Sequence, residues 1–315
     1  MTTRAEILSV AAGRSLGPGP VALAVDVGGT GMKAVLFDEA GRLVEAITAP
    51  TPECADAAAG EVVDVVAEFG AEFGRTHPAH PIAEAAVVLP GIVDEATGTG
   101  VFSANLGWRN VPFARILTDR LGVATTVSHD VRAAGRAEFA LAEEMPGNAA
   151  MVTIGTGIAA AIMVEGRLVS AGGFAGEVGF CEVAVDTADG LFRGPIEHIA
   201  SAAAIARRYS ARSSTAVAGS LDVLGAMHSG DAVAAEVFAE AVDALGAMCA
   251  QLVAVVAPEA IVFGGGLSSA DELLDGVDAA LRSRLDFHRA PRIRRAELGP
   301  VAGLIGAGLL TRRTR

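Results

Sequence analysis

Residues 21–37 read VALAVDVGGTGMKAVLF, and this stretch sets what is expected of the rest of the chain. An apolar, β-branched run ends at Asp26 and enters a turn containing Gly28, Gly29 and Thr30, as strands that run into tight turns do. The two glycines let backbone N–H groups approach an anion closely. The stretch therefore predicts a phosphate-binding hairpin, with an ordinary Gly-rich β-hairpin as the alternative.

The charged and hydroxyl residues of this hairpin suit a magnesium nucleotide. Asp26 is expected to hold a hydrated Mg²⁺, because a carboxylate and a phosphate need a cation between them. Thr30 adds a hydroxyl donor and Lys33 a compact positive charge within a few residues of the turn.

The following sequence alternates between strand and helix patterns, which predicts an α/β protein. Helical spacing covers residues 55–73, short strands are expected at 82–89 and 125–128, and a helix is expected at 131–144. Asp130 falls between the last strand and the last helix, where open α/β sheets bind their ligands. It is either a functional carboxylate or a helix N-cap, and the residues leave both interpretations open.

Two more glycine turns follow strands later in the chain. One lies between expected strands at 150–154 and 158–164, and the other follows a strand at 260–263. Their turn residues are Gly155, Thr156 and Gly157 in the first, and Gly264, Gly265 and Gly266 in the second. The first repeats the phosphate hairpin, and three consecutive glycines indicate close approach of a flat ligand such as a purine or its ribose. A plain tight turn is the alternative.

Composition limits the class of protein. A chain of 315 residues predicts two lobes, and its net charge of −13 argues against nucleic-acid binding. Its apolar stretches end well before 18 residues, so no membrane span is expected. Cys54, Cys181 and Cys249 form no C-x-C or C-x-x-C pair, which favours a reducing cytoplasm. Residues 1–20 are expected to be a mobile extension without a persuasive signal peptide.

These motifs resemble those of the ROK family, within the actin-like ATPase superfamily. The matching segments are DVGGTGMK (26–33), PGIVD (90–94), ANLGW (104–108), GTG (155–157), GEVG (176–179), residues 194–201 and VFGGGL (262–267). The resemblance covers residues 21–310. It implies an α/β, two-lobed, ribonuclease H-like fold with ATP, Mg²⁺ and a sugar meeting in the cleft between the lobes. The expected small lobe is 21–128 plus 300–315, including a final helix at 301–310, and the large lobe is 129–299.

The resemblance also implies roles for individual residues. Asp130 corresponds to the general base that takes a proton from a sugar hydroxyl. The residues expected around the substrate are Gly91, Asn105, His129, Asp130, Glu177, Phe180 and Glu197. The residues expected to bind the nucleotide are Asp26, Gly28, Gly29, Thr30 and Lys33, together with the glycine turns at 155–157 and 264–266. Without the resemblance, Glu177 and Glu197 would be interpreted as solvated loop carboxylates.

Three departures from the family pattern affect cofactor and substrate. His129 stands where the kinases usually carry Asn, and Phe180 stands where they carry a histidine that binds both zinc and sugar. Residues 189–195 contain none of the cysteines of the usual zinc segment. The sequence therefore predicts no zinc site. A modified sugar or a cyclitol becomes a candidate substrate, because altered polar contacts reject the original hydroxyl pattern. The alternative is that Phe180 simply packs the loop.

The main prediction is an ATP-dependent kinase acting on a hexose or a hexose-like ring. One alternative is a sugar-binding protein without catalysis. Another is a sugar-responsive regulator, which in this family requires an added helix-turn-helix domain, whereas only 20 residues precede the first expected strand. The alanine-rich helix expected at 233–256 is predicted to be buried core, although such helices also form dimer contacts, and a homodimer is expected.

Overall fold

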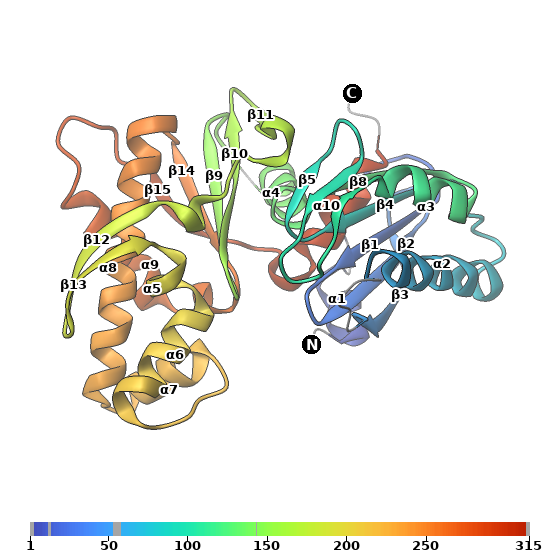
Figure 1. Ribbon diagram of the computed structural model, residues 1–315. Helices are drawn as coiled ribbons and strands as arrows, with labels where there is room; N and C mark the ends of the chain where they lie inside the picture. Colours follow the sequence, from blue (N-terminus) through green and yellow to red (C-terminus); the bar gives the residue numbers. More distant parts are fainter. Residues whose placement is uncertain (1–2, 12–13, 53–57, 143, 313–315) are drawn as a thin grey trace. The chain divides into compact units, whose positions relative to one another are not determined.

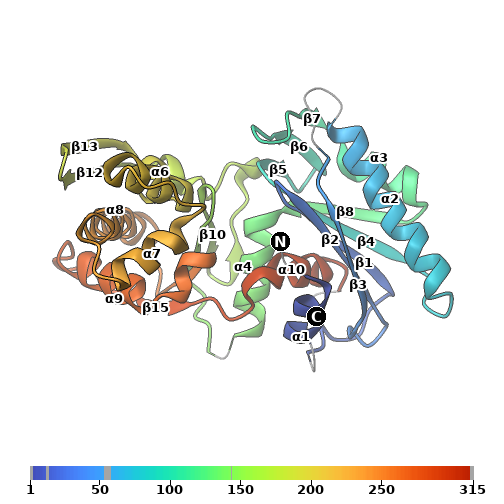
Figure 2. The same cartoon turned by 90° about the horizontal axis from the view of Figure 1, so that it is seen from below.

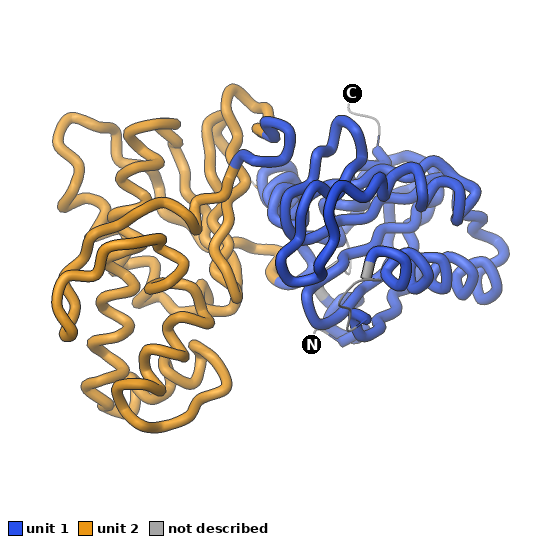
Figure 3. The backbone as a smooth tube through the Cα atoms, in the orientation of Figure 1, with its two compact units in different colours: residues 1–141, 170–175, 300–315 blue, residues 142–169, 176–299 orange. Residues whose placement is uncertain are grey.

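The computed structural model describes residues 3–11, 14–52, 58–142 and 144–312. The chain forms two units (Figure 3): unit 1 comprises residues 1–141, 170–175 and 300–315, and unit 2 comprises 142–169 and 176–299. The boundary expected after residue 128 lies too early. His129 and Asp130 consequently belong to unit 1, and the short segment 170–175 returns to it.

Unit 1 is built on a five-stranded main sheet and a smaller separate sheet (Figure 1). The strands of this unit are β1 (Ala22–Val27), β2 (Gly31–Phe37), β3 (Leu43–Pro50), β4 (Glu84–Leu89), β5 (Ile92–Asp94), β6 (Thr99–Phe102), β7 (Arg109–Val111) and β8 (Ala124–His129). Its helices are α1 (Arg4–Ala11), α2 (Ala58–Thr76), α3 (Phe113–Leu121), α4 (Asp130–Leu141) and α10 (Ala302–Leu310). The main sheet has the order β3-β2-β1-β4-β8, while β5, β6 and β7 form a separate small sheet.

Unit 2 contains a second five-stranded sheet and a hairpin. Its strands are β9 (Ala149–Ile154), β10 (Ile158–Val164), β11 (Arg167–Leu168), β12 (Glu182–Thr187), β13 (Gly190–Pro195), β14 (Ala260–Gly264) and β15 (Arg292–Arg295). Its helices are α5 (Glu197–Ala200), α6 (Ala202–Ser213), α7 (Ser220–His228), α8 (Ala232–Val256) and α9 (Asp271–Arg282). The sheet has the order β11-β10-β9-β14-β15, and β12 pairs with β13.

Both main sheets have the same pattern of strand directions. In unit 1, β1 is antiparallel to β2 and parallel to β4, which is in turn parallel to β8. In unit 2, β9 is antiparallel to β10 and parallel to β14, which is parallel to β15. Each sheet therefore places a hairpin beside two parallel strands. The repeat that the two glycine turns suggest extends to the whole sheet.

The core of unit 1 forms around its central strand. Every residue of β1 is buried, as expected for an apolar strand between two neighbours. Helices α4 and α10 pack against each other on one face of the sheet, and α2 and α3 cover the other (Figure 2). The N-terminal segment differs from its prediction as a mobile extension. Residues 4–11 form α1, which packs on β3 and buries Ile7.

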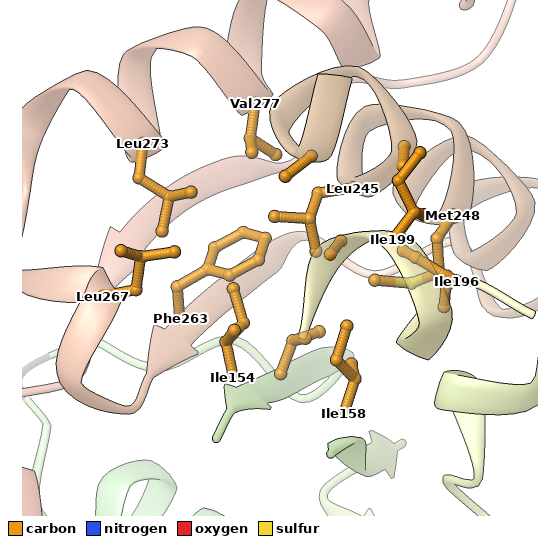
Figure 4. Packing of buried hydrophobic residues seen from close by; sticks show 14 of the residues in the cluster. Ile154, Ile158, Ile196, Ile199, Leu245, Met248, Phe263, Leu267, Leu273 and Val277 are labelled. Atoms are coloured by element: carbon orange, nitrogen blue, oxygen red, sulfur yellow. The ribbon is translucent and has the colours of Figure 1, made fainter. Parts of the chain in front are cut away.

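The core of unit 2 forms around α8 and the ends of β9 and β14. Phe263, Leu245 and Ile154 lie within one cluster of buried side chains (Figure 4). The carboxylate of Asp231 caps α8 by accepting hydrogen bonds from the N–H groups of Val233 and Ala234. Among the described residues α8 is the helix long and apolar enough to cross a membrane. About half of its residues are buried in unit 2, so its prediction as buried core is confirmed.

Candidate functional site

The carboxyl ends of three parallel strands define one edge of the unit 1 sheet. Strands β1, β4 and β8 are neighbours, and they end at Val27, Leu89 and His129. Asp26, Gly91 and Asp130 therefore lie at the same edge, as open α/β sheets place ligand-binding groups. Asp26 is the next-to-last residue of β1, one position inside the strand that was expected to stop there.

Asp26 and Lys33 form an ion pair across the first hairpin. They are directly opposite in the β1–β2 register, and Lys33 Nζ lies 3.0 Å from Asp26 Oδ2. Lys33 Nζ also donates to the carbonyl oxygen of Pro300 at 3.3 Å. Burial raises the pKa of Asp26, Lys33 opposes that rise, and the negative charge of Asp130 adds to it.

The turn between β1 and β2 is closed by its own backbone. The Gly28 N–H donates to the Gly31 carbonyl at 3.0 Å, and the Thr51 hydroxyl donates to the Gly28 carbonyl at 2.6 Å. A Cβ at Gly28 would lie 2.8 Å from the Gly31 carbonyl oxygen, so a side chain does not fit there. Gly29 and Thr30 are exposed at the tip. The tip can approach a phosphate without rearrangement of the hairpin.

Asp130 begins α4, and one of its carboxylate oxygens is held by its chain neighbours. Asp130 Oδ1 accepts a hydrogen bond from the Val131 N–H at 2.7 Å and lies 3.0 Å from His129 Nε2. A capping side chain bonds the N–H two or three residues ahead, whereas this bond comes from the next residue. Burial alone would raise the pKa of Asp130, but His129, the Val131 N–H and the charge of Arg132 lower it below its usual value.

Two charged residues beside Asp130 were not identified from the sequence. Glu95 Oε1 accepts from Ser128 Oγ at 2.7 Å and from Arg132 Nε at 2.8 Å. Arg132 is fully buried and also donates to the carbonyl oxygens of Val93 and Gly173, at 2.7 and 3.2 Å. The signal in the sequence was weak: Glu95 directly follows the 90–94 motif, and Arg132 comes two residues after Asp130.

A cavity of about 760 Å³ in unit 1 connects the β1–β2 turn with Asn105. Gly29 and Thr30 line it together with Asn105, the end of β3, and Glu68 on α2. Asn105 is exposed, so its amide is available to a ligand.

Gly91 has a positive φ of 92° at the same edge of the sheet as Asp130. A Cβ at this position would lie 2.3 Å from the carbonyl oxygen of Phe102. The close approach of these two backbone segments therefore requires glycine.

In unit 2, the two glycine turns lie beside each other at the ends of parallel strands. Strands β9 and β14 pair up to Thr153 and Gly264, so the turns that follow them are adjacent. A Cβ at Gly265, whose φ is 93°, would lie 2.0 Å from the Ile154 carbonyl oxygen. Gly264 is the last residue of β14, and a short 3₁₀ turn follows at Gly266–Ser269. Helix α9 begins only at Asp271.

Glu197 lies against the turn of β9 and β10. Its Oε2 accepts a hydrogen bond from the Ile158 N–H at 3.0 Å. Added Cβ atoms at Gly157 and Gly179 would lie 2.5 and 3.0 Å from the same oxygen. The segment that carries Glu177 and Phe180 therefore passes beside the second glycine turn. The Phe180 side chain is 65% exposed, although it is apolar.

The β12–β13 hairpin, which contains residues 189–195 in place of the family's usual zinc segment, is held by an ion cluster. Glu240 on α8 pairs with Arg208 and Arg212 of α6, and it accepts from the Ala188 N–H at 2.7 Å. Arg212 also pairs with Asp189 at the hairpin tip, at 2.6 Å. Within the described ranges, no group of three His, Cys, Asp or Glu side chains is arranged to hold a metal. Cys54 lies outside the described residues, and the absence of zinc stays a prediction.

Comparisons with known proteins agree with this arrangement. Residues 22–314 match the ROK family. The glucokinase of Streptomyces coelicolor is 28% identical over 320 residues, covering 92% of this chain and 97% of that protein. The bifunctional enzyme NanE/NanK of Brucella melitensis is 31% identical over 294 residues, covering 92% of this chain and 53% of that protein.

Solved structures give the same result. A ROK family glucokinase from Streptomyces griseus, in complex with glucose and AMPPNP, has a TM-score of 0.76 at 28% identity. That alignment covers 93% of this chain and all of the other. The ROK hexokinase from Thermus thermophilus has a TM-score of 0.77 at 27% identity, covering 92% and 97% of the two chains. The mixed α/β fold with two units, and the match along nearly the whole sequence, show that this chain belongs to the ROK family.

Proposed function

We propose that this protein is an ATP-dependent kinase that phosphorylates a hydroxyl of a hexose or hexose-like ring, with Asp130 as the general base. One observation carries the proposal. Asp130 stands at the carboxyl edge of the unit 1 sheet, the edge that also carries Asp26, and one of its carboxylate oxygens is anchored. A carboxylate in that position, beside a glycine turn suited to phosphate, has the chemistry of phosphoryl transfer to an alcohol.

The names of the relatives support a sugar as the acceptor and ATP as the phosphoryl donor. The curated relatives are named glucokinase, N-acetylgalactosamine kinase and N-acetylmannosamine kinase. The Streptomyces griseus structure contains glucose and AMPPNP, a nucleotide whose β–γ bridging nitrogen stands in for the oxygen of ATP. An ATP-dependent sugar kinase is therefore the reaction class to test first.

The residues of unit 1 suit the phosphates and their metal ion. Asp26 provides one buried carboxylate, and it pairs with Lys33. A single protein carboxylate would suit a Mg²⁺ ion that takes its remaining ligands from water and phosphate. When bound, Mg²⁺ neutralises charge on the transferred phosphoryl group. Gly29 and Thr30 at the exposed tip offer backbone N–H groups and a hydroxyl to the same phosphates, while Gly28 closes the turn beneath them.

Unit 2 supplies the remaining nucleotide contacts of the proposal. Gly155, Thr156 and Gly157 form a second phosphate turn. Gly264, Gly265 and Gly266 allow a purine or ribose to approach the end of β14. Their adjacency at the ends of two parallel strands supports a shared ligand.

The chemistry at Asp130 follows from its charge and contacts. Because its pKa lies below the usual value, Asp130 is ionised at neutral pH and can accept a proton. The acceptor hydroxyl gives its proton to Asp130 while its oxygen forms a bond to the γ-phosphorus. The bond from that phosphorus to the β–γ bridging oxygen breaks, which leaves ADP and a phosphorylated ring.

The acceptor is proposed to contact Gly91 and Asn105 in unit 1 and Glu177, Phe180 and Glu197 in unit 2. Carboxylates suit a polyol because charged acceptors form stronger bonds with O–H donors than neutral ones. Phe180 exposes an apolar ring that offers no hydrogen bond. This favours a deoxy, methylated or acylated sugar, or a cyclitol, over plain glucose.

His129 was expected to contact the substrate directly. Its side chain is only 6% exposed, and its Nε2 faces Asp130. Its role is therefore different from direct contact with the substrate.

The experiment is a phosphoryl-transfer assay with Mg-ATP over a panel of hexoses, amino sugars, deoxy sugars and cyclitols, repeated with Asp130→Asn. Turnover that is lost in the variant supports the kinase. Sugar binding without turnover on any acceptor favours the catalytically inactive sugar-binding protein or a sugar-responsive regulator. A cytoplasmic location and a homodimer are part of the proposal, and size-exclusion chromatography with light scattering tests the homodimer.

A further inference from the structure

The two oxygens of the Asp130 carboxylate have different surroundings. Oδ1 accepts from the Val131 N–H at 2.7 Å and lies 3.0 Å from His129 Nε2. Among the described residues, no donor bonds Oδ2. About a third of the Asp130 side chain is exposed. One oxygen is therefore anchored, and the other is left for a ligand.

The imidazole of His129 is placed to act on Asp130 alone. The residue is buried, and the ring points Nε2 at Asp130 Oδ1. Its other nitrogen, Nδ1, is also buried and has no hydrogen-bond partner in the described part of the chain. An unpaired buried polar atom costs free energy, about 1–3 kcal/mol. Within the described residues, the contact with Asp130 is the polar interaction found for this side chain, and it explains a buried histidine here better than a contact with solvent or sugar does.

The backbone that carries His129 and Asp130 is also held in place by hydrogen bonds. Glu95 Oε1 accepts from Ser128 Oγ at 2.7 Å, from the His129 N–H at 3.4 Å and from Arg132 Nε at 2.8 Å. One carboxylate thus holds residues on both sides of Asp130. Burial would raise the pKa of Glu95, but its bonds with Arg132 and Ser128 lower it, so it stays charged and keeps these bonds. The strand end therefore has little freedom to move His129 away from Asp130.

We infer that His129 is a positioning residue that locks the Asp130 carboxylate, so that Oδ2 is the oxygen that takes the proton of the acceptor hydroxyl. The inference rests on the proposed kinase function and deepens it. Rotation of a carboxylate about its terminal bond is soft, and two donors on one oxygen remove that freedom. Such alignment contributes strongly to the catalytic rate, because a displacement of about 1 Å can lower that rate about a hundredfold.

Three charged or titratable groups act on this carboxylate or are affected by its charge: His129 on β8, Arg132 on α4 and Asp26 on β1. Lys33 on β2 pairs with Asp26. Replacing His129 by an apolar side chain removes a group that favours the ionised form of Asp130. The pKa of Asp130 then rises, and the acid limb of the pH profile of kcat/KM moves to higher pH.

The test compares His129→Gln with His129→Met in the full-length protein. Both side chains have the same length, but only glutamine can present a donor where Nε2 stood. Using the acceptor that the wild type phosphorylates, we expect His129→Met to lower kcat about tenfold to a hundredfold. The KM values for ATP and acceptor should change less than about threefold. His129→Gln should recover most of kcat and the wild-type position of the acid limb.

The controls distinguish a variant that does not fold, a His129 without a positioning role, and an Asp130 that is not the base. Thermal unfolding and ATP binding show whether each variant is folded, and His129→Phe, which keeps a ring of similar volume, replaces His129→Met if the latter does not fold. Equal kcat and equal acid limbs for the wild type, His129→Met and His129→Gln would overturn the positioning role. Turnover that survives Asp130→Asn would instead refute the proposed base itself, whatever the His129 variants do.

Discussion

Lys33 Nζ lies 3.0 Å from Asp26 Oδ2, and the two residues face each other across the β1–β2 hairpin. The cation that balances Asp26 is thus built into the same hairpin as the glycine turn that we propose binds phosphate. Both side chains are largely buried, so neither charge is well solvated without the other.

This pair makes Asp26 the residue whose loss should affect metal and nucleotide together. We predict that Asp26→Ala raises the Mg²⁺ concentration for half-maximal activity and the KM for ATP by about tenfold each. The KM for the acceptor should stay nearly constant. Steady-state kinetics at varied Mg²⁺ measure both, and an unaltered Mg²⁺ dependence would contradict the role given to Asp26.

The glycine turn after β14 offers a matched pair of substitutions. Gly265 has φ 93° and ψ 167°, and an added Cβ would lie 2.0 Å from the Ile154 carbonyl oxygen. At Gly266 the nearest atom to an added Cβ is 3.9 Å away. Gly265→Ala should therefore cost about 2–3 kcal/mol of unfolding free energy, and Gly266→Ala less than about 1 kcal/mol. Urea denaturation checks this, and equal losses would show that the turn is not constrained as described.

The ion cluster on the β12–β13 hairpin predicts a response to acid. Burial alone would raise the pKa of Glu240, but Arg212, the Ala188 N–H and Arg208 lower it. A lowered carboxyl pKa stabilises the fold above the unfolded-state value, about 4.3. That stability is lost as pH falls through the folded-state pKa. Glu240→Gln should thus lower the unfolding free energy at pH 7 by about 3 kcal/mol.

The same substitution should also flatten the acid dependence of stability, because glutamine does not titrate. Calorimetric unfolding between about pH 7 and pH 3 measures both effects. Asp243→Asn serves as a control, because Asp243 pairs with Arg284 at a more exposed position on the same helix. A Glu240→Gln protein that loses stability in acid as steeply as the wild type would refute the cluster's role.

Local signals explain which parts of the fold were predictable. The apolar run before Asp26 and the glycines after it specify a strand and a tight turn within a few residues. The strands at β4, β8, β9 and β14 were likewise predicted to within a few residues, because each is an apolar or β-branched run ended by Gly, Pro, His or Asp. Asp130 was identified because a carboxylate at the end of a strand is visible in the sequence itself.

Long-range contacts explain what the sequence did not reveal. Segment 170–175 returns to unit 1 because Arg132 bonds the carbonyl oxygen of Gly173, and a Cβ at Gly173 would lie 2.5 Å from that of Val93. No local pattern marks such a contact between residues 41 positions apart. Glu95 and Arg132 resemble solvated charges in sequence, and only the fold shows that they pair with each other, with Arg132 buried and Glu95 partly buried. The packing of α1 was missed because its anchor, Ile7, is a single apolar residue.

The central claim is that Asp130 deprotonates the alcohol that receives the γ-phosphoryl group of ATP. The most direct test follows transfer of the labelled γ-phosphate to the acceptor panel for the wild type and Asp130→Asn, with ATP affinity measured for both. We predict turnover of at least one hexose or cyclitol by the wild type. In Asp130→Asn the loss should be about a thousandfold, with ATP affinity nearly unchanged. Equal turnover by the two proteins, or transfer to no acceptor by the wild type, would contradict the claim.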